Sequence, residues 1–93
     1  MAQRTETLED VGLLEETLTG PRLVVFNDDV NTFDWVIESL VEVCNHDPVQ
    51  AEQCAILIHH KGQATVKEGE KRKLKPMCEA LVDRGIDAVL EQS

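Results

Sequence analysis

Three neighbouring polar residues, Asn27, Asp28 and Asp29, follow a short apolar run and precede a helical pattern. Their two carboxylates and one amide are hydrogen-bond acceptors, so they could bind a cation or an ammonium group. The same residue types favour turns, because Asn and Asp side chains bond to nearby backbone N–H groups. Acid–base catalysis fits less well, since adjacent side chains at a turn splay apart. Turn formation and ammonium binding both remain open.

A histidine, His59, falls on the same helical face as Ala55 and Ile58, at i, i+3 and i+4 spacing. This face is apolar and ends in an imidazole. A capping histidine above a stripe of core residues is the simplest interpretation of such a pattern.

Other reactive side chains give weaker predictions. Cys44, Cys54 and Cys78 are an odd number without a C-x-x-C pair, which is typical of buried thiols in a reducing compartment. No pair of cysteines or histidines has zinc-ligand spacing, so we expect no metal and no other cofactor. Cys54 and His59 are five residues apart on a helix, where side chains do not meet well. A thiol hydrolase is therefore remote.

Helical and strand periodicities alternate along the chain. An i, i+3, i+4, i+7 apolar spacing predicts an amphipathic helix over 33–44. Asp47-Pro48 suits an N-cap and first helical position, and Gly62 suits a stop, so a second helix is predicted between them. A third helix is predicted over 70–84, with Pro76 in its first true turn because an interior proline costs about 3 kcal/mol. Strands are predicted at 23–26, 63–67 and 86–90.

This order, β-α-α-β-α-β, predicts an α+β fold in a single domain, with a small antiparallel sheet and helices on one face. A chain of 93 residues, 42% of them hydrophobic, buries one modest core and leaves little room for a deep catalytic cleft. The domain is expected to span 21–93. Residues 1–20 are expected to be a flexible acidic tail, either a disposable end or a segment that enters a partner.

Eighteen acidic and nine basic residues give a net charge of −9. This balance argues against nucleic acid and anionic membrane surfaces as partners. No apolar run is long enough to cross a bilayer, and no signal peptide is evident, so we expect a cytoplasmic protein. We also expect it to be a monomer. Residues 61–75 are the exception, because they hold six of the nine bases. That stretch is either a docking surface or a solvated helix start.

Two segments taken together resemble the ClpS family of protease adaptors. One is the strand, N-D-D turn and helix start of residues 25–36, and the other is the apolar run ending in H-H-K-G at 51–62. The resemblance covers about residues 21–91. It implies an adaptor that is not an enzyme. Such an adaptor binds proteins beginning with Leu, Phe, Tyr or Trp and delivers these N-degrons to a Clp AAA+ ATPase coupled to the ClpP peptidase.

The resemblance also implies roles for individual residues. Asn27, Asp28 and His59 would contact the α-amino group of the substrate. Glu70 and Lys75 have the spacing of a pair that docks the N-terminal domain of the ATPase. The first side chain of the substrate would enter a hydrophobic pocket lined by Asn31, Phe33, Ala55, Ile58 and Ile86.

An α-amino group suits the three polar residues chemically. Its pKa is about 8, so at neutral pH it is mostly an ammonium with three N–H donors. An internal amide has a single N–H donor and carries no charge. An acceptor left unpaired costs about 1–3 kcal/mol, which disfavours internal sequence.

Phe33 and Ala55 depart from the family, in which Met is common at the first position and Met or another large residue at the second. The two changes compensate if these side chains face each other. In the family, the larger residue at the second position excludes substrates that begin with Val or Ile. With the small Ala55, this exclusion is an open question. The alternative function is a ribosomal-stalk-like interaction domain of the same layout that does not recognise N-termini.

Overall fold

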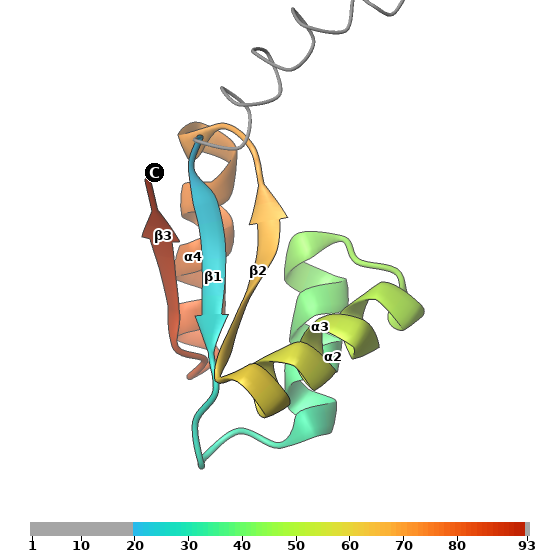
Figure 1. Ribbon diagram of the computed structural model, residues 1–93. Helices are drawn as coiled ribbons and strands as arrows, with labels where there is room; N and C mark the ends of the chain where they lie inside the picture. Colours follow the sequence, from blue (N-terminus) through green and yellow to red (C-terminus); the bar gives the residue numbers. More distant parts are fainter. Residues whose placement is uncertain (1–19, 93) are drawn as a thin grey trace, which may run out of the picture.

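The computed structural model describes residues 20–92, so residues 1–19 of the expected tail lie outside the described part of the chain. The strands are β1 (Arg22–Phe26), β2 (Gln63–Glu68) and β3 (Ala88–Glu91), and the helices are α2 (Phe33–Cys44), α3 (Pro48–Lys61) and α4 (Lys71–Asp83) (Figure 1). The predicted order β-α-α-β-α-β is confirmed. None of the helices within 20–92 has the length and apolar content needed to cross a membrane.

The sheet has the strand order β2-β1-β3, and both pairings are antiparallel. Arg22 pairs with Glu68 on one side and with Glu91 on the other, so β1 is the central strand. Alternate residues of each strand join the helices in one apolar core, which places the helices on one face of the sheet, as predicted. These strand residues are Leu23, Val25, Ala64, Val66, Ala88 and Leu90.

Local capping chemistry sets the bounds of the first two helices. The Thr32 hydroxyl accepts a hydrogen bond from the Trp35 backbone N–H at 3.0 Å, and α2 ends at Asn45, which has a left-handed φ of 60°. The Asp47 carboxylate accepts from the Gln50 N–H at 2.9 Å, and α3 ends at Gly62 with φ 90°. Both sets of signals were readable in the sequence.

The prediction for Pro76 was wrong, because this residue lies in the second turn of α4 and not in its first. The helix already begins at Lys71, since the Glu70 carbonyl accepts from the N–H groups of Lys73 and Leu74 at 3.0 Å each. Leu74 is 1% exposed, so its burial fixes this early start. The carbonyl that Pro76 cannot bond belongs to Arg72, an exposed residue, so water can replace the missing donor.

The last strand also begins later than predicted, at Ala88 and not at Ile86. The Ile86 N–H donates to the Leu81 carbonyl at 3.0 Å, and the Gly85 N–H donates to Val82 at 2.9 Å. This pair of bonds is the Schellman motif, with Gly85 in the left-handed region at φ 84°. Ile86 therefore closes α4, and its N–H is not available to a strand.

Candidate functional site

The loop between β1 and α2 and the neighbouring parts of α2 and α3 form a cavity of about 410 Å³. The β1–α2 loop, which supplies part of its lining, lies below the lower end of β1 in the view of Figure 1. Polar side chains come from the loop and from the last turn of α3, and apolar side chains come from the helices. The lining residues are Asn27, Asp28, Asp29, Asn31, Phe33, Val36, Ala55, Ile58 and His59. A mixed lining and a volume of this order are typical of ligand pockets.

Backbone hydrogen bonds explain why the loop meets the end of α3. The Asn27 N–H donates to the Gly62 carbonyl at 2.9 Å, and the Phe26 N–H donates to the Asp87 carbonyl at 2.9 Å. Because Gly62 directly follows α3, the first of these bonds holds Asn27 beside the helical turn that carries His59. Residues more than thirty positions apart in the chain thus line one cavity.

The Asp28 carboxylate organises the loop. Its Oδ1 atom accepts from the backbone N–H groups of Val30 at 2.9 Å and Asn31 at 2.8 Å, and its Oδ2 atom accepts from Asn31 Nδ2 at 2.8 Å. The backbone bond from Asn31, aided by the other two, holds the pKa of Asp28 below its usual value of 3.8. The carboxylate is therefore ionised at neutral pH. The predicted role of this residue type in forming the turn is confirmed.

The helical face predicted for Ala55, Ile58 and His59 forms one wall of the cavity. Ala55 and Ile58 are 2% and 3% exposed, so their side chains form the buried, apolar part of the cavity wall. Phe33 is 42% exposed and lies at the open side. The face is thus a cavity wall as well as part of the core. His59 itself is exposed, and its ring meets that of His60 edge-on with centroids 5.2 Å apart.

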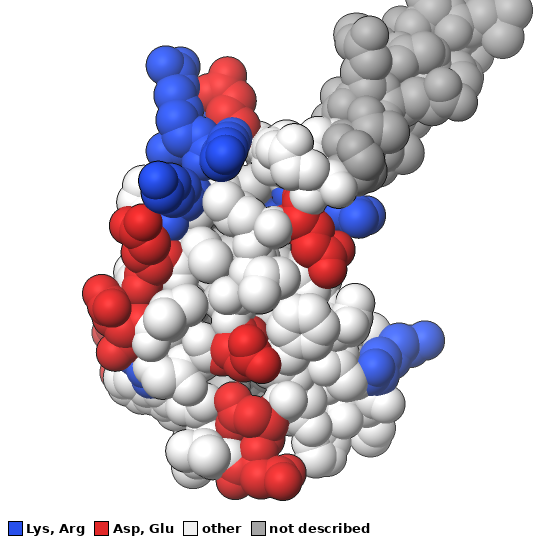
Figure 2. All heavy atoms as spheres, turned by 90° about the vertical axis from the view of Figure 1, so that its left-hand side faces the viewer, with Lys and Arg blue, Asp and Glu red and all other residues white. Residues whose placement is uncertain are grey.

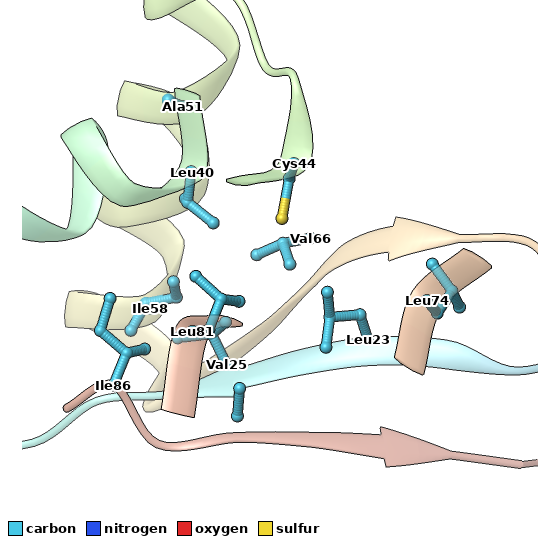
Figure 3. Close-up of a cluster of buried hydrophobic side chains, with 11 residues drawn as sticks. Leu23, Val25, Leu40, Cys44, Ala51, Ile58, Val66, Leu74, Leu81 and Ile86 are labelled. Atoms are coloured by element: carbon cyan, nitrogen blue, oxygen red, sulfur yellow. The ribbon is translucent and has the colours of Figure 1, made fainter. Parts of the chain in front are cut away.

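The structure brings together seven of the eight residues assigned to the substrate site, and the exception is Ile86. Ile86 is 3% exposed and belongs to the buried cluster with Ile58, Leu81 and Val25 (Figure 3). Two lining residues, Asp29 and Val36, had no such assignment. Val36 lies three residues after Phe33, so its place on the same face of α2 was available as a signal.

Glu70 and Lys75 lie at the start of α4, away from the cavity. Glu70 is the N-cap residue, and its Oε1 atom pairs with Arg72 Nε at 3.0 Å. Lys71, Arg72, Lys73 and Lys75, which we call the α4 basic patch, are exposed. Figure 2 shows basic side chains gathered at the upper end of the molecule, and Figure 1 places the start of α4 there, opposite the β1–α2 loop.

The three cysteines and His46 do not line the cavity. Cys44, Cys54 and Cys78 are free, and burial raises the pKa of the Cys44 thiol to about 11, which makes it a poor nucleophile. His46 is 3% exposed, and its Nε2 atom lies 2.7 Å from the Val66 carbonyl oxygen, to which it donates. Within residues 20–92 no group of three His, Cys, Asp or Glu side chains could hold a metal ion.

Two curated relatives show the extent of sequence similarity. The ATP-dependent Clp protease adapter protein ClpS of Campylobacter jejuni is 37% identical over 59 residues, which cover 63% of this chain and 59% of the relative. The protein of the same name from Streptomyces coelicolor is 27% identical over 90 residues, which cover 97% of this chain and 94% of the relative. The chain thus spans about three fifths of the length of the first relative and nearly all of the second.

A solved structure shares the fold. The structure described as Agrobacterium tumefaciens ClpS2 bound to L-phenylalaninamide matches with a TM-score of 0.75 over 78% of this chain and 95% of that one, at 18% sequence identity. The family model described as ATP-dependent Clp protease adaptor protein ClpS matches residues 21–88, which include the whole lining of the cavity and the start of α4. The chain therefore belongs to the ClpS family of ATP-dependent Clp protease adaptor proteins.

Proposed function

We propose that this protein binds protein substrates by a bulky hydrophobic N-terminal residue and delivers them to a Clp AAA+ ATPase. The observation that carries the proposal is the composition of one cavity, where acceptor side chains from the loop and from α3 adjoin an apolar hollow. In this proposal the α-ammonium group of the substrate binds to Asn27, Asp28 and His59. Its first side chain enters the hollow formed by the apolar lining residues.

The hydrogen-bonding inventory supports this assignment. An α-ammonium group has three N–H donors, and the cavity offers an amide oxygen, an ionised carboxylate and an imidazole nitrogen. Each charge-assisted bond contributes about 1.5–3 kcal/mol, and burial of a Leu or Phe side chain contributes roughly 1.5–3 kcal/mol. After the cost of ordering the peptide, a dissociation constant near micromolar is expected, which suits a carrier that must release its cargo.

The ligand named in the similar A. tumefaciens ClpS2 structure also supports the proposal. L-phenylalaninamide has a free α-amino group and an aromatic side chain. A molecule with these two groups matches the two halves of the cavity. The fold likeness makes the comparison relevant, and the lining residues of this chain supply the chemical complementarity.

The placement of the α4 basic patch supports delivery. It lies at the opposite end of the molecule from the cavity (Figures 1 and 2), so a partner docked there would leave the cavity open. In the proposed function Glu70 and Lys75 contact the N-terminal domain of the ATPase. A basic patch on a protein of net charge −9 suits a partner with an acidic surface.

Substrate recognition is tested by titrating the protein with a labelled peptide that begins with Phe and with its N-acetylated twin. Acetylation removes the charge and two donors, so binding should fall at least about tenfold. His59→Ala should weaken binding of the free peptide by about 1–3 kcal/mol. His60→Ala is the matched control, since His60 is also exposed on α3 but does not line the cavity. Equal affinity for the two peptides would favour the alternative interaction domain.

Docking is tested separately with an isolated Clp ATPase N-terminal domain. Lys75→Glu should weaken its binding, and the loss should shrink at high salt because the contact is electrostatic. Lys61→Glu makes the same charge change at the end of α3 and serves as the control. Equal binding of both variants and the native protein would remove Lys75 from the docking surface.

A further inference from the structure

The Asn31 side chain links the polar side of the cavity to a distant part of the chain. Its Nδ2 atom donates to Asp28 Oδ2 at 2.8 Å and to the Gly85 carbonyl oxygen at 2.8 Å. Both partners are acceptors, so the NH₂ group faces them and both of its hydrogens are used. Asn31 therefore lines the cavity, as the resemblance implied, and also acts as a bridge between the loop and the turn after α4.

The far end of this bridge is firmly held. Gly85 belongs to the Schellman motif that closes α4. The preceding carbonyl, of Arg84, accepts from Trp35 Nε1 at 3.1 Å. The Arg84 guanidinium lies over the Trp35 ring at 5.3 Å and donates to Glu42 Oε1 at 2.6 Å. Two consecutive carbonyls of the turn are thus bonded to side chains from Asn31 and from α2.

The near end is different, because the other bonds to Asp28 come from its own loop. Asp28 Oδ1 accepts from the N–H groups of Val30 and Asn31, and these groups move with the loop. Val30 at the loop tip is 86% exposed, so little packing holds it. Of the three hydrogen bonds to this carboxylate, the one from the Asn31 side chain continues to another element.

We propose that Asn31 is a positioning residue that holds the Asp28 carboxylate against the turn after α4, so that a substrate ammonium group meets an acceptor already in place. This role in binding rests on the proposed function, but the position of the carboxylate does not. Because the carboxylate is already held in position, less free energy is needed to order it when the peptide binds. Asn31 thus contributes to affinity through Asp28 and the Gly85 carbonyl.

The test compares Asn31→Ala with Thr32→Ala. Asn31→Ala removes the bridge, whereas Thr32→Ala removes the N-cap of α2 and leaves the side chains of Asp28 and Asn31 untouched. Two quantities are measured in each variant: the NMR-titrated pKa of Asp28 in the free protein, and the affinity for a Phe-initiated peptide across pH. Thermal melts give the stability of both. Neither substitution changes a charged or titratable group, so Asp29, Asp34, His59, Arg84 and Asp87 are the same in both variants.

Asn31→Ala should raise the pKa of Asp28, move the acid limb of the binding profile to higher pH and weaken binding about two- to tenfold at neutral pH. Thr32→Ala should lower the melting temperature but leave the Asp28 pKa and the acid limb unchanged. Asn31→Asp, which keeps the shape of the side chain, should weaken binding more than Asn31→Ala because it sets a carboxylate against two acceptors.

An unchanged Asp28 pKa in Asn31→Ala would overturn the proposal, since the carboxylate would not depend on the bridge. A raised pKa with unchanged affinity would also overturn it, because binding would not need the carboxylate held. The pKa measurement uses no ligand. Native protein that fails to bind the peptide would therefore count against the proposed function alone, while the same titration still decides whether Asn31 positions Asp28.

Discussion

Ala55 lines the apolar part of the cavity, and in the proposed function a larger side chain at this position should change which first residues the protein accepts. Ala55 is 2% exposed and lines the same cavity as Phe33. A methionine at position 55 would extend a thioether arm into a space of about 410 Å³. We expect Ala55→Met to narrow the range of accepted first residues to those with an unbranched Cβ.

The expected size of the effect follows from packing. In the native protein the small Ala55 side chain does not obstruct a β-branched side chain, and burial of Val or Ile contributes roughly 1.5–3 kcal/mol, as for Leu. Peptides beginning with Ile should therefore bind within about tenfold of those beginning with Leu. Overpacking costs about 1–3 kcal/mol. β-Branched side chains are stiff at χ1 and cannot turn away, so the Leu-to-Ile ratio should rise by about 5- to 150-fold.

The assay measures affinities for peptides that begin with Leu, Phe, Val or Ile and share the remaining sequence. Leu57→Met is the control, because Leu57 is 44% exposed on the same helix and does not line the cavity. Melting curves establish that each variant is folded. Identical discrimination by the native protein and Ala55→Met would refute the reasoning, since the cavity wall at position 55 would then play no part in selection.

Three further predictions concern stability and pH. Leu81→Ala should lower the free energy of unfolding by about 2–5 kcal/mol because Leu81 is fully buried, whereas Val82→Ala, at a residue 52% exposed, should change it by less than about 0.5 kcal/mol in denaturant titrations. Pro76→Ala should raise the melting temperature, since it restores a helical N–H and removes a penalty of up to about 3 kcal/mol. Because the pKa of Asp28 is lowered on folding, its stabilising effect should be complete above the ordinary pKa of 3.8 and be lost as pH falls through the lowered value, which melts in acid would detect.

The sequence predicted best those features that depend on neighbouring residues. Thr32, Asp47 and Gly62 bond to backbone groups within four positions, so the start of α2 and both bounds of α3 follow from local chemistry. The place of Pro76 within α4 was harder to predict, because Glu70 makes no side-chain cap and the burial of Leu74 fixes the position of the helix. Burial of Leu74 in the core thus outweighs the preference of Pro76 for the first turn of a helix.

The site was predictable as a set of residues but not as an arrangement. The bond from the Asn27 N–H to the Gly62 carbonyl joins positions that no periodicity relates, and the bridge from Asn31 to Gly85 spans 54 residues. Ile86, which the resemblance implies lines the pocket, is not among the residues that line this cavity. Its apolar side chain was recognisable in the sequence, but its place in the buried cluster beside Ile58 depends on the way α4 ends.

Asp28 shows why two interpretations that compete in a sequence can hold together in a structure. Turn formation and ammonium binding both require the oxygens of this side chain, and residue types alone left both interpretations open. An ionised carboxylate has about four acceptor positions. The turn uses two at Oδ1, and the Asn31 side chain uses one at Oδ2. One position remains on Oδ2, the atom that the bridge to Gly85 holds in place, so the turn prepares the acceptor for the ammonium group that we propose it binds.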